Sequence, residues 1–585
     1  MPILILLVIV PYSAVAEEEE SGGWLGKAIN FYSEGSYELA LLYVNKSLDI
    51  DPGYPDAWNL KGYIESDMGQ YREAADSFNR SLEVDPSDPY IWYSEGFALH
   101  NLEGYDEAVA CYDRALELNS SHLDFWRARG IALYRAGRFE EAAESYDEAL
   151  VIDPSQGDVW RQKGLALSAM ERYDEAIECY DFAIEIDDQD VSSWHGKGLV
   201  LYEMGRPDDA LECYDRAILI DPSSADVWFN KGIVLSSLGR TEDAFKCYDA
   251  AIDIDPLYHE AWYNKGLALY GLGRFEEAVA CYDEALKVDQ NLVAVWNNKG
   301  NALFALGKLS EALDCYEKAA SIDPSYSNAW FNQGVVFDRL GREGEAVEAY
   351  DRTIEIDPAY KDAEYNKALA LYDLGRYEEA IESFDRVLAA EPANGNAWYN
   401  KGLALGRLGR YDEALDCYDE ALKTEPSDAD VLNNKCNTLL ILGRYNESVA
   451  CYDEVIETDS NYENAWYNKG VALDRLGRYG EAVSCYDEAV RINGSRVDAW
   501  RGRGDALANI GEYDEAVESY NGAIAINSDD PDVWYNRGFV LYNAGRLDEA
   551  VESYDQALDI DPSRQEVWRS KGLALYDLER YQEAF

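Results

Sequence analysis

Residues 259–290, HEAWYNKGLALYGLGRFEEAVACYDEALKVDQ, contain the pattern that decides the fold. Trp262, Gly266 and Leu269 follow one another at helical spacing, which places them on one face of a helix. Gly273 comes just after this helix, where a left-handed backbone conformation is needed to end it. A second stretch with helical spacing of apolar residues begins two residues later. The segment therefore predicts two helices joined by a short turn.

The same pattern recurs every 34 residues along the chain. All 15 tryptophans lie on one series with this step, from Trp24 to Trp568, and Glu364 and Leu432 stand at its two remaining places. When the tryptophan is numbered position 4, position 8 is Gly in 14 of 17 repeats and position 20 is Ala in 16. Position 24 is almost always Tyr or Phe. A fixed period of this length is typical of helix–turn–helix repeats.

This register of Trp, Gly, Ala and Tyr resembles the tetratricopeptide repeat (TPR) family. The resemblance covers residues 21–585, as 16 whole repeats and a partial seventeenth. It implies an all-α fold in which stacked antiparallel helix pairs form a right-handed superhelical solenoid. In that family the first helix of each pair lines a concave groove, with positions 2, 5, 6, 9 and 13 on that side. One helix pair has too little core to fold alone, so stacked neighbours supply the stability.

Composition excludes several classes of function. The 585 residues include 113 acidic and 51 basic side chains, for a formal net charge of −62. Binding to nucleic acid needs a cationic surface, so nucleic acid is excluded as a partner. No stretch near 18 apolar residues is present, and membrane insertion is therefore not expected. The chain has four histidines and no P-loop, G-x-S-x-G or C-x-x-C motif, so we expect no enzyme activity, no cofactor and no metal site.

Two repeat positions hold most of the basic side chains. Position 7 is Lys or Arg in 15 of 17 repeats, and position 16 is Lys or Arg in 13. Position 25 is Asp or Glu in 13 of 16 repeats. We predict ion pairs between neighbouring helices, each of which contributes little to stability. The alternative, a cationic track for an anionic ligand, fits poorly with so acidic a chain.

The cysteines follow the repeat as well. Nine of the ten stand at position 23, and the tenth, Cys436, replaces the glycine of position 8. Equivalent residues of stacked helix pairs lie about 9–10 Å apart, whereas a disulfide needs Cα atoms closer than about 7 Å. Neighbours in this series are therefore not expected to bridge, and the cysteines are predicted to be small apolar packing residues.

The N-terminus differs from the rest of the chain. Residues 3–10 read ILILLVIV and are followed by Ala14-Val15-Ala16, a combination that resembles a secretory signal peptide, although no Lys or Arg precedes the apolar run. We expect residues 1–16 to be a signal peptide and residues 17–20, EEEE, to be a short acidic lead. The protein would then be exported or associated with the cell envelope. Free thiols fit poorly with export, and a cytoplasmic location is the alternative.

Asparagine recurs at position 6, where a mediocre helix former needs a reason. The predicted peptide-binding asparagines are Asn230, Asn264, Asn298, Asn332, Asn366, Asn400, Asn434 and Asn468, and Asn536 adds a ninth. Aromatic residues often stand beside them at position 5, and those predicted to contact a peptide are Tyr263, Phe331, Tyr365, Tyr399 and Tyr467. This series resembles the asparagine ladder in the TPR superhelix of O-linked N-acetylglucosamine transferases, which grips polypeptide backbone. The alternative is that WYNKG is merely the consensus of duplicated repeats.

The resemblance implies a non-enzymatic scaffold for protein–protein interactions, with a protein or peptide partner that would be basic. Residues 225–475 are the expected groove. Two alternatives stay open: an acidic structural or cell-surface protein without a specific ligand, and an interaction subunit of an enzyme assembly.

The C-terminal end is predicted to be a surface for self-association. The last repeat stops at Phe585, within the first turn of its second helix. Four apolar residues are expected on a face without a complete partner helix, which would favour head-to-tail contacts between chains: Trp568, Leu573, Leu575 and Leu578. The alternative is a fragment whose natural continuation supplies the missing helix.

Overall fold

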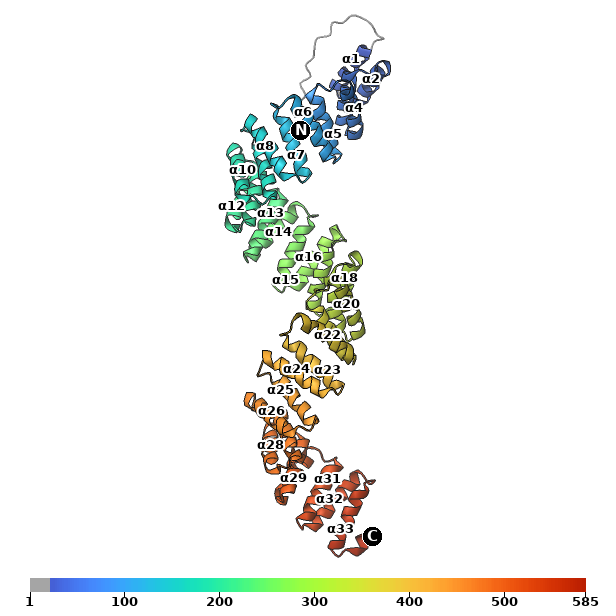
Figure 1. Ribbon diagram of the computed structural model, residues 1–585, viewed down its shortest axis with the longest axis vertical. Coiled ribbons are helices and arrows are strands. Elements are labelled where there is room, and N and C mark those ends of the chain that lie inside the picture. The colour runs from blue at the N-terminus through green and yellow to red at the C-terminus, as the bar shows by residue number, and fades with distance from the viewer. Residues whose placement is uncertain (1–20, 585) are drawn as a thin grey trace. The chain divides into compact units, whose positions relative to one another are not determined.

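The computed structural model describes residues 21–584, and in this range the chain forms 34 α-helices and no strand (Figure 1). Each 34-residue repeat contributes two consecutive helices, and these pack against each other as an adjacent pair. Each pair then contacts the pair that follows it within the same unit. The prediction of an all-α fold built from stacked helix pairs is confirmed.

The chain divides into two compact units, Met1–Gln290 and Asn291–Phe585. The helices of the first unit are α1 (Ser21–Ser33), α2 (Tyr37–Ile50), α3 (Pro55–Asp67), α4 (Tyr71–Val84), α5 (Pro89–Asn101), α6 (Tyr105–Leu118), α7 (Leu123–Arg135), α8 (Phe139–Ile152), α9 (Gly157–Ala169), α10 (Tyr173–Ile186), α11 (Val191–Glu203), α12 (Pro207–Ile220), α13 (Ala225–Ser237), α14 (Thr241–Ile254), α15 (His259–Gly271) and α16 (Phe275–Val288).

The second unit repeats the arrangement. Its helices are α17 (Val293–Ala305), α18 (Leu309–Ile322), α19 (Ser327–Arg339), α20 (Glu343–Ile356), α21 (Ala363–Asp373), α22 (Tyr377–Ala390), α23 (Gly395–Arg407), α24 (Tyr411–Thr424), α25 (Ala429–Ile441), α26 (Tyr445–Thr458), α27 (Glu463–Arg475), α28 (Tyr479–Ile492), α29 (Val497–Ile510), α30 (Tyr513–Ile526), α31 (Pro531–Asn543), α32 (Leu547–Ile560), α33 (Gln565–Asp577) and α34 (Tyr581–Ala584).

The turn within each repeat forms as the sequence predicts. In the repeat that contains α15 and α16, Gly273 has a φ angle of +74°. The backbone N–H of Arg274 donates a 2.9 Å hydrogen bond to the carbonyl of Leu269, which satisfies one of the carbonyls at the end of the first helix. The chain thereby reverses direction over a few residues, and the second helix begins at Phe275.

A close contact between positions 8 and 24 sets the distance between the two helices of a repeat. Tyr418 of α24 is 2% exposed, and its ring lies against the backbone of Gly402 in α23. A Cβ atom added to Gly402 would lie 2.6 Å from Cε1 of this ring, which is closer than real Cβ atoms approach. Ala414, at position 20, is fully buried beside them. Small residues at positions 8 and 20 thus allow the close packing that the sequence predicts.

The tryptophans connect most repeats to the turn before them. Nearly all of these side chains are only half-buried. The indole N–H of Trp398 donates a 3.0 Å hydrogen bond to the carbonyl of Pro392, in the turn before its repeat. The same bond recurs in other repeats, for example from Trp160 to Pro154. An indole N–H needs an acceptor, and with this bond most of the tryptophans connect their helix to the preceding turn.

The two repeats without tryptophan are held together differently. Glu364 replaces the tryptophan in α21, and its carboxylate forms a 2.5 Å ion pair with Arg386 of α22. Leu432 replaces it in α25 and is 3% exposed. In this second repeat the helices are also joined covalently.

A disulfide between Cys436 and Cys451 joins α25 to α26, with a Cα–Cα distance of 5.4 Å. The prediction that all cysteines are packing residues is therefore wrong for this pair. Position 8 faces the second helix of its own repeat, so a cysteine there comes within reach of the cysteine at position 23. No disulfide joins two position-23 cysteines within residues 21–584, and there the prediction is confirmed.

Replacing Glu171 with Gly is expected to stabilise the protein by about 1 kcal/mol. Glu171 ends α9 with a φ of +59°, in a position that most repeats give to glycine. A residue with a side chain loses about 1–2 kcal/mol of stability in the left-handed conformation. Glycine avoids this cost, but the greater conformational entropy of glycine in the unfolded chain offsets part of the gain. Hydrogen exchange of α9 and α10 measures the change. The matched control, Gly137→Glu in the preceding repeat, is expected to destabilise; a neutral or destabilising Glu171→Gly would contradict this account.

Candidate functional site

We define the first-helix face as the surface formed by repeat positions 2, 5, 6, 9 and 13 of the odd-numbered helices within each unit. The position-6 asparagines lie on these helices, and each side chain is half-buried. A half-buried carboxamide has one side against the protein and one side toward solvent. What it offers to a ligand depends on which of its hydrogen-bonding groups the protein itself uses.

Several of these asparagines connect neighbouring repeats. The side-chain N–H groups of Asn400 donate to the hydroxyl of Tyr365 in the preceding repeat, at 3.1 Å, and to the carbonyl of Asn396, at 2.9 Å. Asn434 donates in the same way to the hydroxyl of Tyr399, at 3.0 Å. Since a carboxamide has two N–H donors, the side-chain oxygen is the group of Asn400 that remains for a ligand.

Two further asparagines belong to this network, and the sequence reasoning missed both. Asn301 accepts a 2.9 Å hydrogen bond from the hydroxyl of Tyr316 and a 3.2 Å bond from the side chain of Asn332. Asn437 accepts in the same manner from Asn468, at 2.9 Å. Both stand at position 9, where most repeats have an apolar residue. A polar residue at this place, 31 residues before a position-6 asparagine, was the signal in the sequence.

The position-5 aromatic residues contribute to the core as well as to the face. The ring centroids of Tyr399 and Tyr418 are 6.2 Å apart, and those of Phe331 and Tyr350 are 5.7 Å apart. These position-5 rings thus contact the buried tyrosine of their own repeat, and Tyr365 contacts the buried Phe384 in the same way. These aromatic side chains are half-buried, so their removal would disturb the fold as well as any bound ligand.

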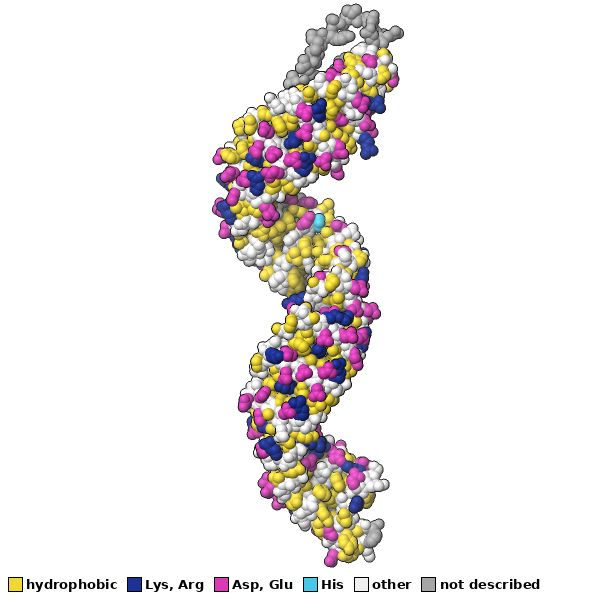
Figure 2. Space-filling view, viewed as in Figure 1, with side chains coloured by type: hydrophobic (Ala, Val, Ile, Leu, Met, Phe, Trp, Pro, Cys, Tyr) yellow, Lys and Arg dark blue, Asp and Glu magenta, His cyan; other side chains and the backbone are white. Residues whose placement is uncertain are grey.

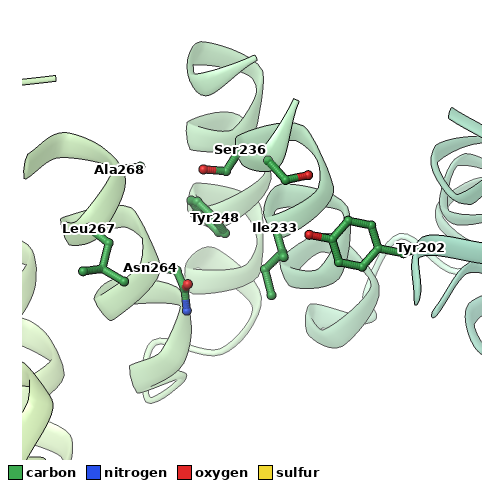
Figure 3. Close-up of a pocket in the computed structure, with 8 residues that line it drawn as sticks. Tyr202, Ile233, Ser236, Tyr248, Asn264, Leu267 and Ala268 are labelled. Atoms are coloured by element: carbon green, nitrogen blue, oxygen red, sulfur yellow. The ribbon is translucent and has the colours of Figure 1, made fainter. Parts of the chain in front are cut away.

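A hollow of about 340 Å³ lies on the first-helix face of the first unit (Figure 3). It brings Asn264 together with residues of two preceding first helices and one second helix. The lining consists of Tyr202 from α11, Ile233, Ser236 and Ser237 from α13, Tyr248 from α14, and Asn264, Leu267 and Ala268 from α15.

Two carboxylates of the second unit lie close together on first helices. Asp474, at position 12 of α27, accepts a 2.7 Å hydrogen bond from the hydroxyl of Tyr486. Burial, with a smaller contribution from the nearby Asp505, raises the pKa of Asp474 to about 6. Burial also raises the pKa of Asp505, which accepts a bond from the hydroxyl of Tyr520. These carboxylates make α27 and α29 acidic here, and buried tyrosines hold both side chains.

The basic side chains of positions 7 and 16 form the predicted ion pairs. The ammonium of Lys401 lies 2.6 Å from a carboxylate oxygen of Asp385, the position-25 residue of the preceding repeat. At position 16, Arg172 pairs with Glu175 of its own repeat at 2.7 Å and with Glu140 of the preceding one at 3.0 Å. Lys and Arg are accordingly interspersed with Asp and Glu in Figure 2. The excess charge that remains on the surface is negative.

The predicted apolar end face is only partly exposed. Trp568 and Leu573 are 52% and 51% exposed, but Leu575 is 2% exposed and Leu578 is half-buried. Leu575 lies in the same core cluster as the residues of α32. The prediction is therefore wrong for Leu575, and self-association stays a prediction. The predicted signal peptide and acidic lead lie outside the described residues.

Neither a metal site nor a membrane span is found in the part of the chain that the structure describes. Within residues 21–584, no three His, Cys, Asp or Glu side chains are grouped so that they could hold a metal ion. No helix of the same range combines the length and apolar character needed to cross a membrane.

Comparison with protein families matches models described as tetratricopeptide repeat or TPR repeat along most of the chain. One model matches residues 98–157, 195–259 and 365–430, and a second matches residues 436–477 and 504–545. Others match residues 155–218 and 327–360. A further model matches single repeats at 55–88, 259–292, 293–326, 463–495 and 531–564. No curated protein matches the chain.

Solved structures give matches of low identity. A structure of Naa15/Naa10 bound to HypK-THB is 15% identical, with 97% of each chain covered and a TM-score of 0.33. The Cut9-Hcn1 hetero-tetramer of the APC/C is 16% identical, covers 95% of this chain and 96% of its own, and has a TM-score of 0.34. YrrB, a TPR protein with an unusual peptide-binding site, is 27% identical over 33% of this chain and 98% of its own, with a TM-score of 0.28.

Glu95 is an exception in the series of basic side chains at position 7. It is 9% exposed, and its Oε2 atom is buried without a hydrogen-bond partner. Burial raises the pKa of Glu95 to about 7, although a hydrogen bond with Cys111 acts in the opposite direction. The position-25 residue that faces position 7 from the preceding repeat is here Asn79 instead of an acid.

Glu95→Gln is expected to remove part of the pH dependence of stability. Because the pKa of Glu95 is higher in the folded than in the unfolded chain, the folded state is favoured at low pH and loses stability as the pH rises from about 4.5 to 7. The loss is about 3 kcal/mol at most. Urea unfolding of α5 and α6, followed by hydrogen exchange at pH 5 and pH 8, measures it.

In this experiment the free energy of unfolding of the glutamine variant should equal that of the parent at pH 5 and should be higher than that of the parent at pH 8. The control is Glu144→Gln, on the exposed surface of α8, which should leave the pH dependence as it is. Equal stability of the Glu95 variant and the parent at both pH values would show that the buried carboxyl is not the cause.

Proposed function

The chain belongs to the tetratricopeptide repeat family, and from this premise we propose that it is a non-enzymatic scaffold that binds an extended polypeptide on its first-helix face. A protein–protein interaction scaffold is what the repeat family supports. The choice of the first-helix face rests on one observation: Asn400 and Asn434 use both side-chain N–H donors within the protein and present a carboxamide oxygen. An extended polypeptide has regularly spaced backbone N–H donors to match a series of such acceptors.

The charge of the surface favours a basic partner. Most side chains of both cationic series are engaged in ion pairs with carboxylates of the same protein, as at Lys401 and Arg172. The carboxylates outnumber the basic groups by more than two to one. A basic polypeptide would therefore be attracted over a distance of about one Debye length, which is about 8 Å at physiological ionic strength.

Replacing Asn264, Asn298, Asn332 and Asn366 with Ala is expected to abolish polypeptide binding and leave the fold intact. The change removes the carboxamide oxygens, while alanine favours the helix. Because Asn332 also contacts Asn297 and Asn301, its removal should cost about 1 kcal/mol. Binding is measured with labelled protein on an array of short unfolded peptides, and folding is followed by circular dichroism.

The control for this variant replaces Asn79 and Asn446 with Ala, since both are exposed on second helices. It should bind as the parent does. Full affinity of the fourfold variant for the same peptides would overturn the assignment of the asparagine series as the binding site.

We further propose that the protein is exported. The support is the apolar run at residues 3–10 with its Ala14-Val15-Ala16 sequence, together with the disulfide of Cys436 and Cys451, since disulfides persist in oxidising compartments. The remaining thiols do not oppose export, because burial raises the pKa of thiols such as Cys179, to about 11, and makes them unreactive.

Terminal sequencing of the protein from its native cells tests this proposal, and Glu17 is expected as the first residue. Alkylation of the unfolded protein should label two fewer cysteines before reduction than after it, because Cys436 and Cys451 are bridged. An intact Met1 in protein recovered from the cytoplasm would contradict export.

A further inference from the structure

A hollow of about 340 Å³ lies between α11, α13 and α15 on the first-helix face of the first unit (Figure 3). We propose that this hollow holds one apolar side chain of a bound polypeptide and that carboxylates at its rim pair with a lysine or arginine of the same polypeptide. This proposal rests on the proposed function, because it assumes that a polypeptide lies on the first-helix face.

Two of the residues that line the hollow are large aliphatic side chains. Ile233 and Leu267 stand at position 9, and Leu267 is 36% exposed. The apolar surface continues at position 9 of α9 and α11, where Leu165 and Leu199 are 36% and 39% exposed. In the second unit, position 9 accommodates polar residues such as Asn301. The fold therefore tolerates polar groups here, and exposed apolar residues in a row indicate a surface that another apolar group covers.

Polar groups at the edge of the hollow can hold the backbone of the partner. The side-chain N–H of Asn264 donates a 2.8 Å hydrogen bond to the carbonyl of Glu260 on its own helix. Its carboxamide oxygen takes no part in this bond and can accept a hydrogen bond from a backbone N–H of the partner. Ser237 donates a 2.8 Å bond to the carbonyl of Val234, so its hydroxyl oxygen is likewise an acceptor. These groups favour a donor-rich ligand, as an extended peptide is.

The charges around the hollow are predominantly negative. None of the eight lining residues is charged. Glu203 directly follows Tyr202 and is exposed, and the exposed Asp226 and Glu260 lie in the first turns of α13 and α15.

The cations of the same repeats are engaged elsewhere. Lys265 forms a 2.5 Å ion pair with Asp249, and Arg274 forms one of 2.6 Å with Glu277. Glu260 lies 3.1 Å from the ring of His259, and Asp226 accepts a 2.8 Å hydrogen bond from the hydroxyl of Tyr258. Neither contact supplies a lysine or arginine, so a basic side chain next to the inserted apolar one complements these carboxylates.

The test uses four synthetic peptides of one polar, uncharged host sequence that differ at two neighbouring places. These places hold Leu and Lys, Ala and Lys, Leu and Glu, or Ala and Glu, and each peptide is titrated against the full chain by fluorescence anisotropy. The peptide with Leu and Lys is expected to bind tightest. Ala in place of Leu should weaken binding about tenfold, since a buried leucine side chain is replaced by a methyl group. Glu in place of Lys should weaken it further, and this second effect should shrink at high salt.

Protein variants identify the hollow as the origin of these preferences. Leu267→Asn places at position 9 the residue that α17 has there, so the fold is kept, and the preference for Leu over Ala should be lost. Leu403→Asn makes the same change in the second unit and should leave the preference unchanged. The triple variant Glu203→Gln, Asp226→Asn and Glu260→Gln should lose the preference for Lys over Glu and keep that for Leu.

Each outcome decides the proposal. If the four peptides bind equally well and the position-6 asparagine variant weakens all of them, the scaffold function stands and the hollow is not the recognition site. If the preferences persist in Leu267→Asn, the hollow is likewise excluded. If no peptide binds the full chain, the result contradicts the proposed binding of extended polypeptides on the first-helix face. It then contradicts the proposal for the hollow as well.

Discussion

In most repeats one close contact sets the spacing of the two helices. The tyrosine ring at position 24 lies against the backbone at position 8, and in the pair Gly402 and Tyr418 there is no room for even a methyl group. With the helices so close, the tyrosine is fully buried and the alanine at position 20 packs beside it. The remaining contacts of the repeat follow from this distance, because the turn, the tryptophan and the ion pairs all connect elements that this contact has already placed.

The same constraint separates the residues that hold the fold from those that a ligand can reach. The residues at positions 8, 20 and 24 pack inside a repeat. Those at positions 4, 7, 16 and 25 connect the repeat to its neighbours through the tryptophan hydrogen bond and the ion pairs. Positions 6 and 9 of the first helices are left half-buried or exposed. Variation in these places costs the fold little, as the exchange of Leu267 for Asn301 at equivalent positions shows. Recognition of a partner can therefore change along the array without change in the scaffold.

The sequence predicted what depends on periodicity, and it missed what depends on side-chain reach. The helix pairs, the glycine turns such as Gly273 and the ion pairs such as Lys401 with Asp385 follow from residues that recur at a fixed place. The disulfide of Cys436 and Cys451 involves a residue that departs from the consensus in one repeat only. Likewise, that Asn400 donates to the preceding repeat could not be read from spacing, because a carboxamide has donors and an acceptor and only the structure shows which are used.

The contact between Gly402 and Tyr418 can be tested by a double-mutant cycle on the unfolding free energy of the repeat that contains α23 and α24. Gly402→Ala alone should destabilise this repeat by about 1–3 kcal/mol, because the added methyl group overpacks the contact. In a Tyr418→Leu background the ring is absent, and the same change should be neutral or should stabilise by up to about 1 kcal/mol through helix propensity. An equal loss of stability in both backgrounds would contradict the claim that this contact sets the spacing of the helices.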